Sequence, residues 1–168
     1  MIQDKKLSYE YIRGLVEGEG TFTFSTSKKN MSDGSIKNTK VPAFAIGMHE
    51  RDEELLRSVR DVLGLKNRVY NYKSFNKDGY KRGRKAFLIV REFGQLKNII
   101  VPFFYKRLRG NKGKQFEQWL EKIGSDPMVS ENFKFIYKIY KAGFYDKNPK
   151  FYDCKCLDCL PHTYDKHL

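Results

Sequence analysis

The stretch from Ile12 to Gly20, which reads IRGLVEGEG, is the most informative part of the sequence for the fold. Its apolar residues predict a helix, although its three glycines lower the stability of a helix. Each glycine in a helix interior costs roughly 1 kcal/mol relative to alanine. Gly14 and Gly18 are four residues apart, so they lie on one helix face and leave room for another helix to approach backbone to backbone. Glu19 falls at the C-terminal end, where the helix dipole disfavours an acid, so we expect a cation nearby.

The pattern around this stretch predicts two β-hairpins that alternate with helices. The first helix starts with Ser8 as its N-cap and runs to Gly18. The predicted strands cover residues 21–27, 41–48, 68–74 and 85–90, joined in pairs through 32–35 and 76–79. The later predicted helices cover residues 50–63, 92–104, 113–123 and 130–142. We expect Gly64 to end the helix before it and Pro102 to cut its helix near the end.

This order of elements predicts an α+β fold with one four-stranded antiparallel sheet, helices on one face and further helices at the C-terminus. The other face of the sheet is then left open. The 168 residues fit one domain. We expect this domain to span residues 1–145 and to be followed at 146–168 by a tail that carries cysteines and histidines.

The net charge of +13, from 33 Lys and Arg against 20 Asp and Glu, predicts a polyanionic partner. Nucleic acid is favoured over an anionic membrane because no basic amphipathic helix stands out and the cations alternate with Tyr, Ser, Thr and Asn. A ribosomal or simply solvated basic surface is the alternative. No apolar run approaches the roughly 20 residues of a membrane span, and the N-terminus lacks the apolar segment of a signal peptide. We therefore expect an intracellular protein without a membrane partner.

The open sheet face is the predicted nucleic-acid surface, because hydroxyl and aromatic side chains share it beside a basic cluster at 66–85. Alternate residues of a strand lie on one face, and an antiparallel ribbon can present them to base edges in the major groove. The predicted DNA-contacting residues are Thr23, Ser25, Ser27, Lys29, Tyr70, Tyr72, Lys81, Arg82, Arg84 and Lys85. The alternative is an ordinary solvated sheet face.

Residues 12–20 resemble the nine-residue motif of the LAGLIDADG homing endonucleases, with Glu in place of both Asp residues of the motif. The resemblance continues through 44–56 and 102–119 and covers roughly residues 8–123. It implies the αββαββα fold of that family, with a saddle-shaped sheet. The implied function is that of an intron-encoded homing endonuclease of a mobile element, which hydrolyses both strands of a long double-stranded DNA target at a specific site.

The single copy of the motif implies a homodimer that acts on a pseudo-palindromic target, since single-copy members pair their motif helices at a two-fold axis. The residues expected at this interface are Gly14, Leu15 and Gly18. Two alternatives within the same fold stay open, an intron-splicing maturase that binds RNA and a non-cleaving DNA-binding protein. The resemblance also implies that the protein acts in a bacterial or phage-infected cytoplasm or in an organelle.

The resemblance further implies divalent-metal-dependent hydrolysis with Mg²⁺, for which Mn²⁺ or Ca²⁺ can substitute in binding. Glu19 matches the metal-binding catalytic acid, and the carbonyl of Gly18 can add an oxygen ligand. Lys112 matches the active-site lysine, although Lys114 is close enough to be confused with it. Glu17 matches the other motif acid and is expected to cap or pair structurally.

One position departs from the family pattern. Met48 stands where many relatives carry a polar residue on the second strand that organises the water network. His49, beside it, either substitutes for that residue or simply starts the next helix.

The C-terminal tail lies beyond the resemblance and carries a cluster of soft metal ligands. Thiolates and imidazole bind zinc, so a tetrahedral site is conceivable at Cys154, Cys156, Cys159 and His162. The spacing is tighter than usual for zinc, and three reduced thiols on a polar tail are the alternative.

Overall fold

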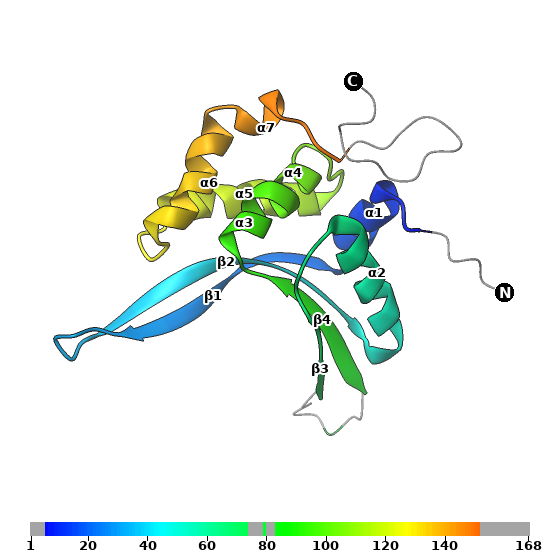
Figure 1. Cartoon of the computed structure of the whole chain (residues 1–168), viewed down its shortest axis with the longest axis horizontal. Coiled ribbons are helices and arrows are strands. Elements are labelled where there is room, and N and C mark those ends of the chain that lie inside the picture. Colours follow the sequence, from blue (N-terminus) through cyan, green and yellow to red (C-terminus); the bar gives the residue numbers. More distant parts are fainter. Residues whose placement is uncertain (1–5, 74–78, 80–82, 152–168) are drawn as a thin grey trace.

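The computed structural model describes residues 6–73, 79 and 83–151. It has the predicted α+β architecture, in which helices lie on one side of a curved four-stranded sheet (Figure 1). The strands are β1 (Gly20–Asn30), β2 (Ile36–His49), β3 (Val69–Lys73) and β4 (Arg84–Val90). The helices are α1 (Tyr9–Glu19), η1 (Glu50–Asp52), α2 (Glu53–Leu63), α3 (Phe93–Gln95), η2 (Leu96–Ile100), α4 (Val101–Phe104), α5 (Asn111–Ser125), α6 (Glu131–Lys141) and α7 (Phe144–Lys147).

The sheet is antiparallel throughout, with the strands in the order β1-β2-β4-β3. β1 and β2 form one long hairpin, whose paired residues run from Gly20 opposite Ile46 to Asn30 opposite Ile36. The tip of this hairpin reaches beyond the helices (Figure 1). The sheet therefore offers a long uncovered surface on the side away from the helices.

Aromatic rings from the sheet and from the later helices form the core between the two layers. The ring of Phe22 on β1 lies 5.6 Å from that of Phe104, 5.0 Å from that of Phe116 and 5.4 Å from that of Trp119, between centroids. The indole Nε1 of Trp119 also donates a hydrogen bond to the carbonyl of Thr23, at 2.8 Å. These contacts fix α5, which carries Phe116 and Trp119, against the edge strand β1.

The predicted ends of two helices are confirmed. The hydroxyl oxygen of Ser8 accepts a hydrogen bond from the Tyr11 amide at 3.1 Å and so caps α1. Gly64 directly follows α2 in the left-handed region, with a φ of 72°. Among the residues that the structure describes, none of the helices combines the length and the hydropathy that a bilayer span requires.

One prediction about element length was wrong. In the first hairpin, β1 extends past residue 27 and β2 starts before residue 41. These exposed ends pair through the backbone, which no side-chain pattern reveals. The helix predicted over 92–104 ends at Phe104, two residues after Pro102, as expected. Pro102 follows the π-helical turn of Leu96–Ile100 and lies at the start of α4, where the missing amide of proline costs little.

Candidate active site and nucleic-acid interface

The chain passes from α1 into β1 without a loop, and Glu19 lies at this junction. Glu19 is the last residue of α1, and Gly20 is the first residue of β1. A Cβ atom on Gly20 would lie 2.8 Å from the Val16 carbonyl oxygen, so only glycine fits the turn. The Glu19 side chain is exposed, and among the described residues it makes no hydrogen bond or ion pair. Its carboxylate is therefore open to a ligand.

Lys112 brings a cation to the same junction. Its Nζ donates a hydrogen bond to the Gly20 carbonyl at 2.6 Å, and the residue is half-buried in the first turn of α5. Lys114 is exposed and lines a groove between α5 and α6 instead. Lys112 thus contacts the backbone of the residue after Glu19, whereas Lys114 does not, and the pairing of Lys112 with the Glu19 carboxylate stays a prediction.

Glu17 has the structural role that the sequence suggested. Its Oε1 accepts hydrogen bonds from the backbone amides of Arg109 and Gly110, the second at 2.8 Å. These amides directly precede α5, and Gly110 is the N-cap of that helix. Glu17 therefore ties the end of α1 to the beginning of α5.

The junction fits one part of a Mg²⁺ site. The Gly18 carbonyl lies in the last turn of α1, where carbonyls lack intrahelical donors, so it and the Glu19 carboxylate are hard oxygen donors of the kind that Mg²⁺ prefers. Within the described ranges, no three side chains of His, Cys, Asp or Glu lie close enough to enclose a metal ion. Mg²⁺ commonly takes one or two protein carboxylates and completes its shell with water and substrate phosphates. The two oxygen donors of the junction thus supply only part of a Mg²⁺ shell.

One face of α1 carries the residues expected at a dimer interface. A Cβ atom on Gly14 or on Gly18 would meet no described atom within 4 Å, so packing inside the chain does not require glycine at either position. Leu15 is half-buried, and Tyr11 is 49% exposed on the same side of the helix, at spacings of three and four residues. The helix thus has an uncovered face whose two glycines are unexplained within one chain.

The open side of the sheet holds most of the predicted DNA-contacting residues. Strand alternation and the observed register place Thr23, Ser25, Ser27 and Lys29 of β1, Tyr70 and Tyr72 of β3 and Lys85 of β4 on this side. The rings of Tyr70 and Tyr72 stack with their centroids 5.9 Å apart, and both are exposed. Hydroxyl groups and stacked rings thus lie at opposite edges of one surface.

Arg84 does not share that surface. It precedes Lys85 on β4, so its side chain lies on the face that carries the helices, where Ala86 is buried. The predicted contacts Lys81 and Arg82 lie outside the described residues, as do the candidate zinc ligands Cys154, Cys156, Cys159 and His162.

His49 starts a helix, which was one of its two expected roles. Its Nδ1 accepts a hydrogen bond from the Arg51 amide at 3.2 Å, at the beginning of η1. Met48 points to the other face of β2, where it is half-buried and packs on the core. Met48 therefore supplies no polar group, and the described hydrogen bond of His49 lies at the start of η1.

The sequence did not reveal the role of Arg13, the second residue of the decisive stretch. Its guanidinium is buried and donates hydrogen bonds to the carbonyls of Phe103 and Phe151, at 3.1 and 2.7 Å. It also lies 4.4 Å from the centroid of the Phe103 ring. The carbonyl of Phe151 accepts a second hydrogen bond from Arg107 at 2.8 Å. These contacts hold the segment after α7 against α1.

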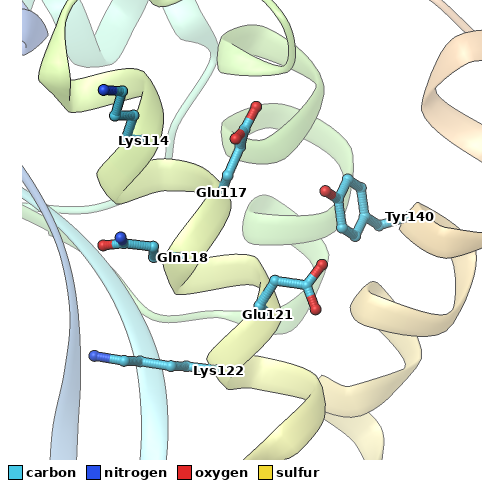
Figure 2. A pocket seen from close by; sticks show the side chains of 6 residues that line it. All are labelled: Lys114, Glu117, Gln118, Glu121, Lys122 and Tyr140. Carbon is cyan, nitrogen blue, oxygen red and sulfur yellow. The ribbon is translucent and has the colours of Figure 1, made fainter.

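The groove between α5 and α6 was also missed. It has a volume of about 520 Å³ and is lined by Lys114, Glu117, Gln118, Glu121, Lys122 and Tyr140. Figure 2 shows Glu117 and Glu121 on the side of α5 that faces Tyr140, with the two lysines and Gln118 pointing away. The spacing of four residues within each set was the available sequence signal.

Comparisons with known proteins agree with the fold. A family model described as LAGLIDADG endonuclease matches residues 12–123. The homing endonuclease I-TnaI is 22% identical, with 82% of this chain and 99% of that chain covered and a TM-score of 0.54. The LAGLIDADG homing endonuclease I-GzeII, solved with a DNA target, is 25% identical, with 84% and 45% covered and a TM-score of 0.53.

A third similar structure is I-SmaMI bound to an uncleaved DNA target in the presence of calcium ions. It is 22% identical, with 85% of this chain and 47% of that chain covered and a TM-score of 0.56. The chain therefore spans less than half the length of I-GzeII and I-SmaMI and nearly all of I-TnaI. Since the family model covers well over half of its residues, the chain belongs to the LAGLIDADG endonuclease family.

Proposed function

We propose that the protein is a site-specific homing endonuclease that acts as a homodimer and cuts both strands of a long, pseudo-palindromic DNA duplex. The observation that carries this proposal is the bond from Lys112 to the carbonyl of Gly20, the residue directly after Glu19, at the α1–β1 junction and beside the uncovered face of α1. I-GzeII and I-SmaMI were solved with DNA targets, and this chain covers only 45% and 47% of their lengths. Two copies of the chain would supply a comparable amount of structure.

In the proposed dimer, the uncovered faces of the two α1 helices pack against each other. Gly14 and Gly18 allow the backbones to approach closely, and Leu15 supplies apolar contact. A two-fold axis through this contact brings the two copies of Glu19 close together, because Glu19 ends the same helix. Each copy then serves one DNA strand.

Each junction supplies the same set of groups to one scissile phosphodiester, and each group has a different task. The Lys112 ammonium stabilises the negative charge that develops on the phosphate, since a preorganised cation needs no rearrangement during the reaction. The Glu19 carboxylate and the Gly18 carbonyl would hold Mg²⁺, which supplies charge stabilisation and activation of the attacking water when bound. The open faces of the two sheets hold the flanking duplex, with hydroxyl and tyrosine side chains toward the bases and lysines toward the phosphates.

Metal-dependent cutting of a randomised DNA duplex library tests this function. We expect cuts in both strands at one pseudo-palindromic site with Mg²⁺, and none with EDTA. Binding of a specific duplex without cutting, in either Mg²⁺ or Mn²⁺, would leave a DNA-binding protein and refute the nuclease. Selective retention of structured RNA over all duplexes would favour the maturase instead.

A further inference from the structure

Two contacts cross in opposite directions between the α1–β1 junction and the start of α5. Oε1 of Glu17, on α1, accepts hydrogen bonds from the amides of Arg109 and Gly110. Nζ of Lys112, on α5, donates to the carbonyl of Gly20 at 2.6 Å. We infer that Glu17 is a positioning residue that holds the start of α5 so that the Lys112 ammonium stays at the junction. This inference rests on the proposed function, because it gives Glu17 a part in the same cleavage site.

The first turn of α5 depends on Glu17 for its capping carboxylate. A helix N-terminus has free amides and the positive end of the helix dipole, and it favours an anion. The N-cap of α5 is Gly110, so the helix has no side-chain cap of its own, and Glu17 accepts from the amides of Gly110 and of the residue before it. A Cβ atom on Gly110 would lie 3.6 Å from Oε2 of Glu17, so the carboxylate packs directly on the backbone. The acceptor therefore comes from α1 rather than from α5 itself.

This cap fixes the position of Lys112 because the helix is anchored again further along. Trp119 is buried and bonded to the Thr23 carbonyl, so the middle of α5 cannot move freely. Lys112 lies between this anchor and the cap, within the first turn. A lysine side chain is long and flexible, so the backbone position decides whether Nζ reaches the Gly20 carbonyl. Loss of the cap would free the first turn and with it the ammonium group.

The two motif acids therefore have separate tasks. Oε1 of Glu17 is occupied by two backbone amides, whereas the Glu19 carboxylate is bonded to no described residue. Removing Glu17 should slow the chemical step through Lys112 and leave the metal ligands and the sheet in place. The expected signature is a lower rate constant with little change in DNA affinity.

A double-mutant cycle in single-turnover cleavage tests this coupling. We expect Glu17→Ala to lower the cleavage rate at saturating DNA by roughly 10- to 100-fold, which is typical of a misplaced catalytic group. Glu17→Ala combined with Lys112→Ala should be no slower than Lys112→Ala alone, since both changes act through one ammonium. Glu17→Gln keeps an oxygen acceptor and should recover much of the rate.

Glu10→Gln is the matched control, because Glu10 also lies on α1 and contacts Arg109. Its Oε2 lies 3.8 Å from the guanidinium of Arg109, whose side chain is 85% exposed. An exposed pair of this kind contributes little, so this variant should cleave like the parent protein. The inference would be overturned if the rate losses of Glu17→Ala and Lys112→Ala multiplied in the double variant. It would also be overturned if the Glu17→Ala protein cleaved at the parental rate.

Amide hydrogen exchange and the NMR signal of the Lys112 ammonium give a readout that needs no cleavage. Glu17→Ala should lose protection at Arg109 and Gly110 and shift the Lys112 signal, while Glu10→Gln should change neither. If the parent protein cuts no DNA, the proposed function fails and this readout alone decides. An unchanged Lys112 signal in Glu17→Ala would then overturn the positioning role.

Discussion

Replacing Gly14 and Gly18 by alanine is expected to stabilise the folded monomer and to break the dimer. Within one chain, a Cβ atom at either position would meet no described atom within 4 Å, so the methyl groups cause no clash. Each substitution removes the helix penalty of glycine, which is roughly 1 kcal/mol in a helix interior. Gly18 lies in the last turn and contributes less, so the free energy of unfolding of the monomer should rise by about 1–2 kcal/mol in total.

The same methyl groups would lie where two backbones meet in the proposed dimer. Overpacking a close contact costs typically 1–3 kcal/mol per site, and two-fold symmetry repeats each substitution. Because every 1.4 kcal/mol corresponds to a tenfold change, we expect the dissociation constant of the proposed dimer to rise by roughly 1000-fold or more. Cleavage of the target should fall with the dimer population.

Urea unfolding at dilute concentration measures the first effect, and sedimentation equilibrium over a concentration series measures the second. Gly94→Ala on α3 is the matched control, because Gly94 is likewise helical with open space around its Cβ position. It should change dimer dissociation and cleavage little. Parental association in the double alanine variant would refute the α1 interface, and a destabilised monomer would refute the reasoning about open space.

Three further perturbations test the metal ligand, the DNA surface and the ion pair between β2 and the end of α5. Glu19→Gln removes the anion that a hard cation needs, so Mg²⁺-dependent cleavage should fall by several orders of magnitude while gel-shift affinity is kept or rises; parental cleavage would make the acid structural. Lys29→Ala with Lys85→Ala should lower the slope of log affinity against log salt by roughly 0.9 for each phosphate that is no longer neutralised, and an unchanged slope would remove these lysines from the DNA surface. The Lys40 ammonium, 2.7 Å from Asp126, holds the pKa of that carboxyl below its ordinary value. The ion pair therefore stabilises the fold above the unfolded-state pKa of Asp126, and this stabilisation is lost as the pH falls through the folded-state pKa. Asp126→Asn should therefore be less stable than the parent to urea at pH 7, with the difference shrinking below about pH 4; equal stability at pH 7 would show that the pair contributes nothing.

Side-chain periodicity predicted the elements whose two sides lie in different surroundings. Phe22 alternates with Thr21 and Thr23 because one side of β1 faces the core and the other faces solvent. Beyond Thr26 every residue of β1 is exposed, so the pattern disappears although the backbone pairing continues to Asn30. The length of the hairpin could therefore be found only from the structure.

Contacts to backbone carbonyls leave no trace in the sequence. In a chain with 33 Lys and Arg, Arg13 looks like another surface cation, yet it is buried against the carbonyls of Phe103 and Phe151. Every residue has a carbonyl, so composition does not reveal which one meets a given donor. The same reason hid the bond from Lys112 to the Gly20 carbonyl, although the resemblance identified the lysine.

Glu17 and Glu19 show where residue chemistry alone stops being informative. Both are glutamates in the last turns of α1, and a separation of two residues turns them by about 200° around the helix axis. Glu17 thereby meets the amides before α5, while Glu19 lies at the junction with no described partner. The difference arises from α5, which is more than 90 residues away in sequence and is held in place by the aromatic core. The motif resemblance distinguished the two acids, and the long-range fold gives the physical reason, since the start of α5 provides amide partners to Glu17 and no described residue provides one to Glu19.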